Sequence, residues 1–150
     1  MNITKAYNFI NIDENVSSSG TMMNTNLKSL ADAKYDAVIN LLPDDNEHAK
    51  KEERESFEAL NIDYTYIPVD WDAPTQTDFD VFEKVLIAAK NKKIHIHCAA
   101  NYRATAFYAL YAYKNLGWSR GKIDTFTASI WQISDYPVWL KFIDDRTNDA

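Results

Sequence analysis

One cysteine and one arginine, with four residues between them, have the types and spacing for chemistry on an anion. Cys98, the only cysteine, ends an alternating run that begins at Ile94, and Arg103 opens a helix-like segment. In a strand–loop–helix the backbone N–H groups and the helix dipole favour a thiolate and a bound oxyanion. Arg103 adds a planar fork that fits an oxyanion. A lone cysteine at a strand end is more often a small buried residue, but its combination with His97 and Arg103 favours a nucleophile in an anion cradle.

The rest of the chain supplies the elements that must hold this loop. We expect strands at 5–12, 35–42 and 62–69 and in the run that ends at Cys98, and a short extended piece followed by a turn at 16–21. We expect helices at 24–33, 47–60, 103–116, 119–133 and 136–143, and one that follows a Thr75 cap. This alternation predicts an α/β three-layer sandwich, a mostly parallel sheet flanked by helices, in one domain over 1–150. The site then lies beyond the carboxyl ends of the strands, as Cys98 does.

The composition limits what such a site binds. The net charge of −6, with only four arginines, does not fit a binder of duplex nucleic acid. No window is apolar enough to span a membrane, and residues 1–9 lack the apolar region of a signal peptide, so we expect a cytoplasmic location. One cysteine excludes an internal disulfide and a multi-cysteine zinc site. His95 and His97 share one face of their strand, and we expect them to be buried and hydrogen-bonded rather than metal ligands. We expect no cofactor.

The segment from His97 to Arg103 resembles the signature loop of cysteine-dependent protein tyrosine and dual-specificity phosphatases. Three further motifs occur in the order and spacing of an uncharacterised bacterial family of phosphatase-like proteins, whose members also occur fused to β-lactamase-like hydrolases. These motifs are Ser19-Gly20-Thr21, the run 35–41 and Tyr66-Ile67-Pro68-Val69. The resemblance covers roughly residues 16–117 and implies a cysteine-phosphatase fold that acts on a phosphate-bearing small molecule or a phosphoprotein.

The resemblance also implies a role for each residue of the loop. Cys98 would attack phosphorus to form a phosphocysteine, and Arg103 would bind the phosphoryl oxygens. His97 would orient the loop by hydrogen bonding. The backbone N–H groups of the loop, including those of Ala99, Ala100, Asn101 and Tyr102, would complete the cradle. Thr105 is the nearest candidate for the hydroxyl that stabilises the thiolate as a leaving group.

Phosphatases of this kind use an aspartate on an upstream loop as general acid. Trp71-Asp72-Ala73-Pro74 has the composition of such a loop. Asp72 is the first candidate for the acid and Asp70 the second. A solvated loop carboxylate or a cap for the next helix is the alternative reading of Asp72.

The loop departs from the phosphatase signature in two ways. It has one residue fewer between cysteine and arginine, and it lacks the usual glycine, although Asn101 tolerates the left-handed conformation that such a turn needs. Rhodanese-type sulfurtransferases share this shorter spacing and carry a persulfide on the cysteine. Besides a phosphatase, the sequence therefore allows a sulfurtransferase that uses a Cys98 persulfide, or a non-catalytic phosphate-binding or anion-binding module.

Overall fold

Five strands form one sheet in a computed structural model that describes residues 3–148. The spatial order is β1-β2-β5-β3-β4, in which β1 pairs antiparallel with β2 and the other pairs are parallel. The strands are β1 (Ile10–Asn11), β2 (Val16–Ser19), β3 (Ala37–Asn40), β4 (Asp63–Tyr66) and β5 (Ile94–His97). The carboxyl ends of the parallel strands meet at one edge of the sheet, where Ser19, His97 and Asn40 lie side by side.

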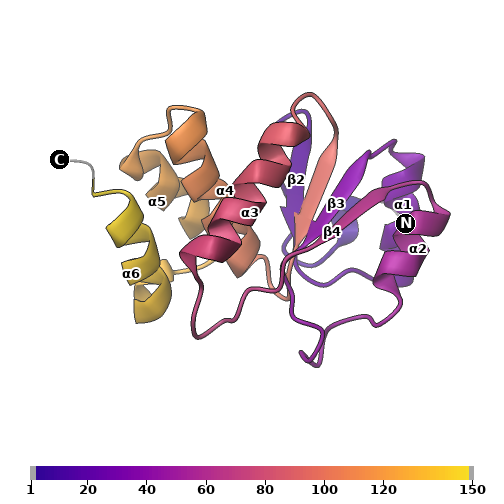
Figure 1. Cartoon of the computed structure of the whole chain (residues 1–150), viewed down its shortest axis with the longest axis horizontal. Helices are drawn as coiled ribbons and strands as arrows, with labels where there is room; N and C mark the ends of the chain where they lie inside the picture. Colours follow the sequence, from indigo (N-terminus) through magenta and orange to yellow (C-terminus); the bar gives the residue numbers. More distant parts are fainter. Residues whose placement is uncertain (1–2, 149–150) are drawn as a thin grey trace.

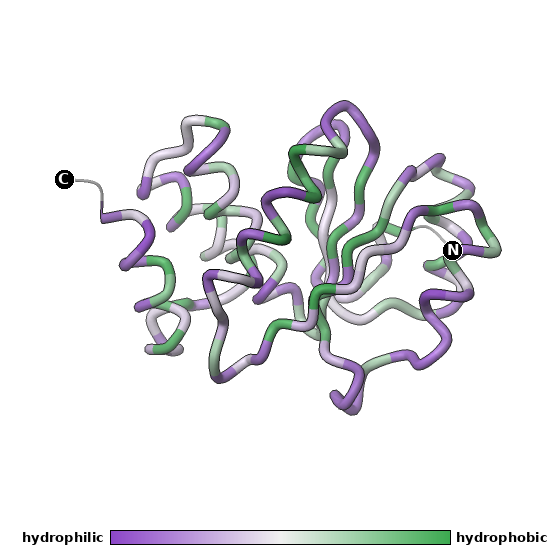
Figure 2. The backbone as a smooth tube through the Cα atoms, in the orientation of Figure 1, coloured by the Kyte–Doolittle hydropathy of each residue, from purple (hydrophilic) through white to green (hydrophobic). Residues whose placement is uncertain are grey.

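Helices cover both faces of the sheet (Figure 1). One face carries α1 (Asn24–Asp32) and α2 (Glu53–Ala59); the other carries α3 (Gln76–Ala88), α4 (Tyr102–Asn115), α5 (Arg120–Ala128) and α6 (Pro137–Arg146). Each face has its own buried hydrophobic cluster, and hydrophobic residues concentrate along the inner strands (Figure 2). The predicted three-layer sandwich with a mostly parallel sheet is therefore confirmed.

Alternation along β5 separates its hydrophobic residues from its histidines. Ile94, Ile96 and Cys98 belong to the larger core cluster, beneath α4. His95 faces the α1–α2 side, where its two ring nitrogens bond Ser17 Oγ at 2.7 Å and Ser19 Oγ at 2.8 Å. Burial holds the pKa of His95 well below its usual range, so this imidazole is neutral. The expectation of buried, hydrogen-bonded strand histidines is confirmed.

Three predicted elements differ from the structure. The strand expected at 5–12 is a 3-10 turn, η1 (Ile3–Lys5), followed by the two residues of β1. The helix expected at 47–60 begins only at Glu53, because Asn46 accepts the His48 and Ala49 amides in a turn of its own. The helix expected at 119–133 ends at Ala128, and a 3-10 turn, η2 (Ile133–Asp135), follows it.

The predicted Thr75 cap is confirmed, because Thr75 accepts the Asp78 amide at 3.1 Å at the start of α3. The strand β4, which precedes Pro68, lies at the edge of the sheet. Gly117 has φ 76° just beyond α4, as expected of a residue that ends a helix. No helix formed by residues 3–148 is long and apolar enough to cross a membrane.

Candidate functional site

The loop between β5 and α4 makes its turn at Asn101. Asn101 has φ 71°, in the left-handed region, and α4 begins at the next residue, Tyr102. Asparagine adopts this conformation more readily than other residues with a Cβ, so the turn does not need a glycine. Cys98 lies directly after β5 at the other end of the loop, and none of its surface is exposed.

Two carbonyl groups of this loop accept hydrogen bonds from other segments of the chain. The Ala99 carbonyl accepts the amide of Thr21 at 2.9 Å and its hydroxyl at 3.0 Å. The Ala100 carbonyl accepts the side-chain amide of Asn8 at 3.0 Å. Within residues 3–148, no backbone N–H of residues 99–103 donates a hydrogen bond. The loop thus offers a row of donors for a bound anion.

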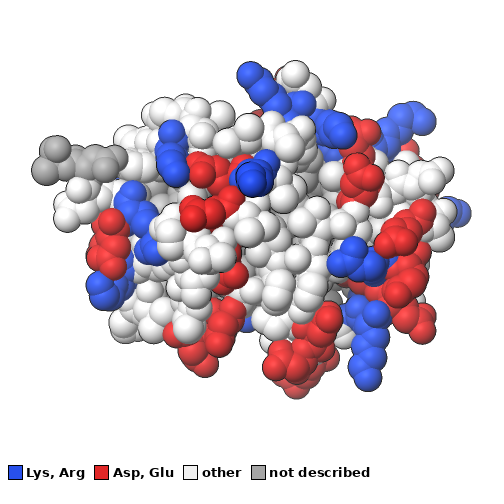
Figure 3. Space-filling view, in the orientation of Figure 1, with Lys and Arg blue, Asp and Glu red and all other residues white. Residues whose placement is uncertain are grey.

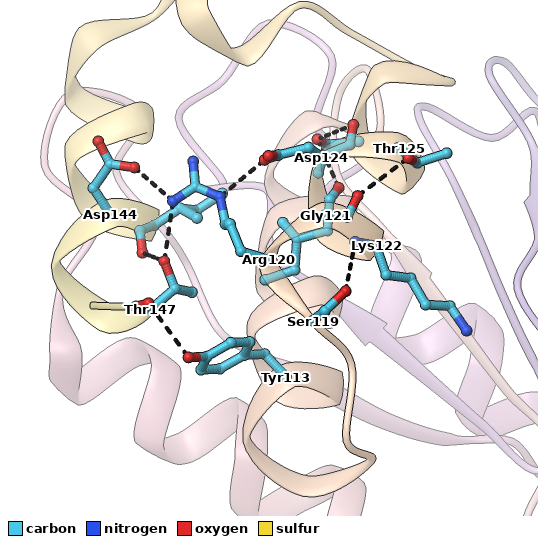
Figure 4. A network of polar contacts seen from close by, with 12 residues as sticks. Tyr113, Ser119, Arg120, Gly121, Lys122, Asp124, Thr125, Asp144 and Thr147 are labelled. Carbon is cyan, nitrogen blue, oxygen red and sulfur yellow. Dashed lines mark hydrogen bonds and ion pairs between the residues drawn. The ribbon is translucent and has the colours of Figure 1, made fainter. Parts of the chain in front are cut away.

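Arg103, in the first turn of α4, is a buried cation that lacks a carboxylate partner in the described part of the chain. Its side chain is 7% exposed, its Nε has no hydrogen-bond partner, and its Cζ lies 5.3 Å from the centre of the Trp71 ring. Arg120 shows the usual arrangement, since it bonds Asp124 at 2.9 Å and Asp144 at 2.6 Å between α5 and α6 (Figure 4). A buried guanidinium is costly without a counter-charge. The burial of Arg103 therefore points to an anionic ligand.

A pocket of about 360 Å³ lies beside Arg103. It is lined by Pro43, Asp45, Asn46, Pro68, Asp70, Trp71 and Arg103. Asp70 thus shares a pocket with Arg103, whereas Asp72 lines a neighbouring hollow of about 180 Å³ against α6. The two aspartates are linked, because the Asp70 carboxylate accepts the Asp72 amide at 2.9 Å. Cys98 does not line the Arg103 pocket.

An aromatic cluster fixes the loop that carries these aspartates. The Trp71 ring lies 5.4 Å from Trp139 and 5.9 Å from Trp131, and its carbonyl accepts the Trp139 indole N–H at 2.8 Å. Tyr102 stacks on Trp131 at 4.6 Å, and burial and the neighbouring Tyr136 raise its pKa. The sequence indicates Trp131, Tyr136 and Trp139 only as core residues. In the structure all three rings contact Trp71, in the loop after β4, and Trp131 and Tyr136 also contact Tyr102, in the first turn of α4, so they connect the two segments.

The histidine before the cysteine is held by a carboxylate from α2. His97 Nε2 lies 2.8 Å from Glu53 Oε2, and both side chains are buried. The Tyr64 hydroxyl donates to the same oxygen at 2.7 Å and accepts from Asn40 at 2.8 Å. Burial raises the pKa of Glu53, but His97 and the Tyr64 hydroxyl outweigh it, so this pKa lies below its usual value. A single buried glutamate in a charged helix gives no sequence signal, so sequence reasoning missed Glu53.

Thr105 bonds to the loop and to the aromatic cluster. Its hydroxyl lies 2.8 Å from the Asn101 carbonyl, to which it donates, and it accepts the Trp131 indole N–H at 3.0 Å. These bonds brace the turn at Asn101. The role of Thr105 toward the thiol stays a prediction.

The chain is similar in sequence to a curated protein. No family model matches the chain. A protein of Agrobacterium fabrum (strain C58), described as beta-lactamase hydrolase-like protein, is 27% identical over 104 residues, which is 67% of this chain and 24% of that protein. The chain thus spans about a quarter of the length of this curated relative.

Solved structures resemble the chain over nearly its whole length. A "Putative phosphatase (DUF442)" from Shewanella putrefaciens CN-32 has 29% sequence identity and a TM-score of 0.89, over 97% of this chain and 95% of that chain. The core catalytic domain of the PP-IP phosphatase SIW14 from S. cerevisiae, in complex with citrate, has 17% identity and a TM-score of 0.76, over 96% and 88% of the two chains. The chain therefore has the α/β fold of protein tyrosine phosphatase-like enzymes.

Proposed function

We propose that this protein is a cysteine-dependent phosphatase of the tyrosine and dual-specificity type, which hydrolyses a phosphomonoester on a small molecule or a phosphoprotein. The observation that carries the proposal is the buried, unpaired guanidinium of Arg103 beside a loop in which two carbonyls bond other segments of the chain. The names of the structural relatives, one a putative phosphatase and one a PP-IP phosphatase, support the reaction class.

The reaction would proceed in two displacements. The Cys98 thiolate attacks phosphorus, and an S–P bond forms as the P–O bond to the alcohol breaks. A carboxylic acid gives its proton to the departing oxygen. Water then attacks phosphorus and passes a proton to the same carboxylate, and the S–P bond breaks to release phosphate. Arg103 and the N–H groups of residues 99–103 hold the oxygens whose charge grows in each step.

Asp70 is the better candidate for the acid. It lines the pocket that contains Arg103, whereas Asp72 faces the hollow against α6. A general acid must lie within hydrogen-bond reach of the leaving oxygen, and that oxygen departs from the phosphate next to Arg103. The preference for Asp72 that the sequence suggested is therefore reversed in this proposal.

A second candidate function is anion binding without turnover. Cys98 is fully enclosed in the larger core cluster and does not line the Arg103 pocket. This enclosure favours a module that holds a phosphate through Arg103 and the loop amides and leaves the thiol unused.

Hydrolysis of para-nitrophenyl phosphate by wild type and by Cys98→Ser separates these functions. We expect turnover by wild type and a loss of roughly a thousandfold or more in kcat for Cys98→Ser. Both proteins should be stabilised by inorganic phosphate in thermal unfolding, which also shows that the variant is folded. Absence of turnover by wild type from acidic to neutral pH, with stabilisation by phosphate intact, would overturn the phosphatase proposal and favour the binding module.

The sulfurtransferase alternative has its own readout. It predicts thiocyanate from thiosulfate and cyanide, with a persulfide on Cys98. Sulfur transfer needs no general acid, so variants of Asp70 and Asp72 should retain that activity. Thiocyanate formation without phosphate release would contradict the phosphatase proposal.

A further inference from the structure

The pocket beside Arg103 holds more negative than positive side chains. Arg103 is the only basic residue among those that line it, and Asp45, Asp70 and Asn46 face the same space. Asp45 and Asp70 are exposed, whereas the Arg103 side chain is buried and its Nε is unpaired. The unpaired guanidinium marks where an anion binds, so the carboxylates surround what is attached to that anion.

Charges outside the pocket are mainly negative. Acidic side chains predominate along the lower edge of the molecule in Figure 3, where a basic side chain also projects, and the loops after β3 and β4 lie at this edge in Figure 1. Lys50 and Lys51, which follow in the loop after β3, line a different pocket next to α1 and α2. A bound phosphate dianion already exceeds the single charge of Arg103. A second anionic group on the ligand would therefore be repelled by Asp45, and no second basic residue of the pocket lining would offset that repulsion.

Resting on the proposed phosphatase activity, we propose that Asp45 makes this site selective for phosphomonoesters whose alcohol part carries a cationic amine, and that it disfavours a second anionic group. An ammonium beyond the ester oxygen would reach the carboxylate of Asp45, while the phosphate stays on Arg103. Asp70 is left free for proton transfer. Pro43, Pro68 and Trp71 supply apolar walls for the carbon skeleton between the two groups.

The test compares two aryl phosphates that differ in their far end. Phosphotyramine carries an ammonium, and the phosphate ester of para-hydroxyphenylpropionate carries a carboxylate, while both leave as similar phenols. We expect wild type to prefer phosphotyramine by about threefold to tenfold in kcat/KM, because the exposed charge of Asp45 attracts the ammonium weakly and repels the carboxylate weakly. Asp45→Asn should reduce this ratio severalfold.

The matched control is Asp44→Asn, which removes the same charge one residue away. Asp44 is exposed and does not line the pocket. Its variant should keep the wild-type preference, because a contact and not the net charge sets it. The assignment of Asp45 would be overturned if the kcat/KM ratio of the two esters were the same in wild type and Asp45→Asn. It would also be overturned if Asp44→Asn lowered that ratio as much as Asp45→Asn does.

Binding to Cys98→Ser distinguishes this proposal from the activity on which it rests. Calorimetric titration should show tighter binding of phosphotyramine than of the carboxylate ester, whether or not wild type turns either over. Turnover of both esters without discrimination leaves the phosphatase in place and overturns the selectivity. Selective binding without turnover overturns the phosphatase and keeps the selectivity, and binding of neither ester overturns both.

Discussion

At the scale of single residues, the proposed recognition of an anion depends on Arg103. Its planar fork presents paired donors to a tetrahedral oxyanion, and lysine cannot reproduce that geometry. We expect Arg103→Lys to lower kcat/KM for para-nitrophenyl phosphate by roughly a hundredfold or more, about 3 kcal/mol of transition-state stabilisation. Steady-state kinetics measure this loss.

Arg120→Lys is the control for that change. Arg120 is paired with Asp124 and Asp144 between α5 and α6 (Figure 4), and it does not line the Arg103 pocket. Its variant should keep wild-type kinetics and change the free energy of unfolding by no more than about 1 kcal/mol. Equal losses of activity in both variants would count against a special role for Arg103.

The two aspartates after β4 are also distinguished at the residue scale. Asp70 shares the pocket of Arg103, and Asp72 does not. We expect Asp70→Asn to lower kcat by about a hundredfold on phenyl phosphate, whose leaving group needs a proton, and by less on para-nitrophenyl phosphate. Asp72→Asn should stay within about threefold of wild type. The reverse pattern in these two rates would assign the acid to Asp72.

At the scale of elements, the loop after β5 depends on how closely the end of β2 approaches it. A Cβ at Gly20 would lie 2.5 Å from the Ala99 carbonyl oxygen and 2.9 Å from the Ala100 Cα, both of them backbone atoms. We expect Gly20→Ala to destabilise the fold by about 1–3 kcal/mol and to weaken phosphate binding, because the loop must shift. Urea unfolding and thermal shift with phosphate measure both effects.

Gly121→Ala provides the matched control for Gly20→Ala. Gly121 lies in α5, and the nearest atom to its added Cβ is Ser119 Oγ at 3.8 Å. Alanine in a helix is favoured over glycine, so this variant should gain about 0.5–1 kcal/mol. If both variants destabilise alike, close packing against the loop is not the reason.

At the scale of the whole molecule, Glu53 joins α2 to the sheet through His97, and this link makes stability depend on pH. The pKa of Glu53 is lower in the folded state than its ordinary value of 4.5. Its contribution is therefore fully present above about pH 4.5 and is lost as pH falls through the folded-state pKa. We expect the free energy of unfolding to fall more steeply between about pH 5 and about pH 3 in wild type than in Glu53→Gln.

Urea unfolding at several pH values measures this difference. At neutral pH, Glu53→Gln should cost about 1.5–3 kcal/mol, as is typical of hydrogen bonds to a charged group. Glu55→Gln, at an exposed position of the same helix, should follow the wild-type pH dependence. A wild-type slope in Glu53→Gln would show that the His97 contact is not the source.

Much of the fold follows from local pattern. The structure contains the alternating residues before Cys98, the helix expected at 103–116 and the Thr75 cap, and each of these patterns acts over a few neighbours. The strand predicted at 5–12 is wrong for most of its length. Its apolar residues fit a strand pattern, but only residues 10–11 form a strand, and the Asn8 side chain instead bonds the Ala100 carbonyl of the loop after β5.

The sequence by itself determined that a cysteine and an arginine flank a short turn between a strand and a helix, because that arrangement depends only on neighbouring residues. The tertiary structure alone decided which distant groups meet there. Asn8 reaches a carbonyl 92 positions away, Glu53 reaches His97 across 44, and Asp70 rather than Asp72 faces Arg103. These meetings depend on how α2 and the loops after β3 and β4 pack against the sheet edge, and packing over such separations leaves no periodic trace in the sequence.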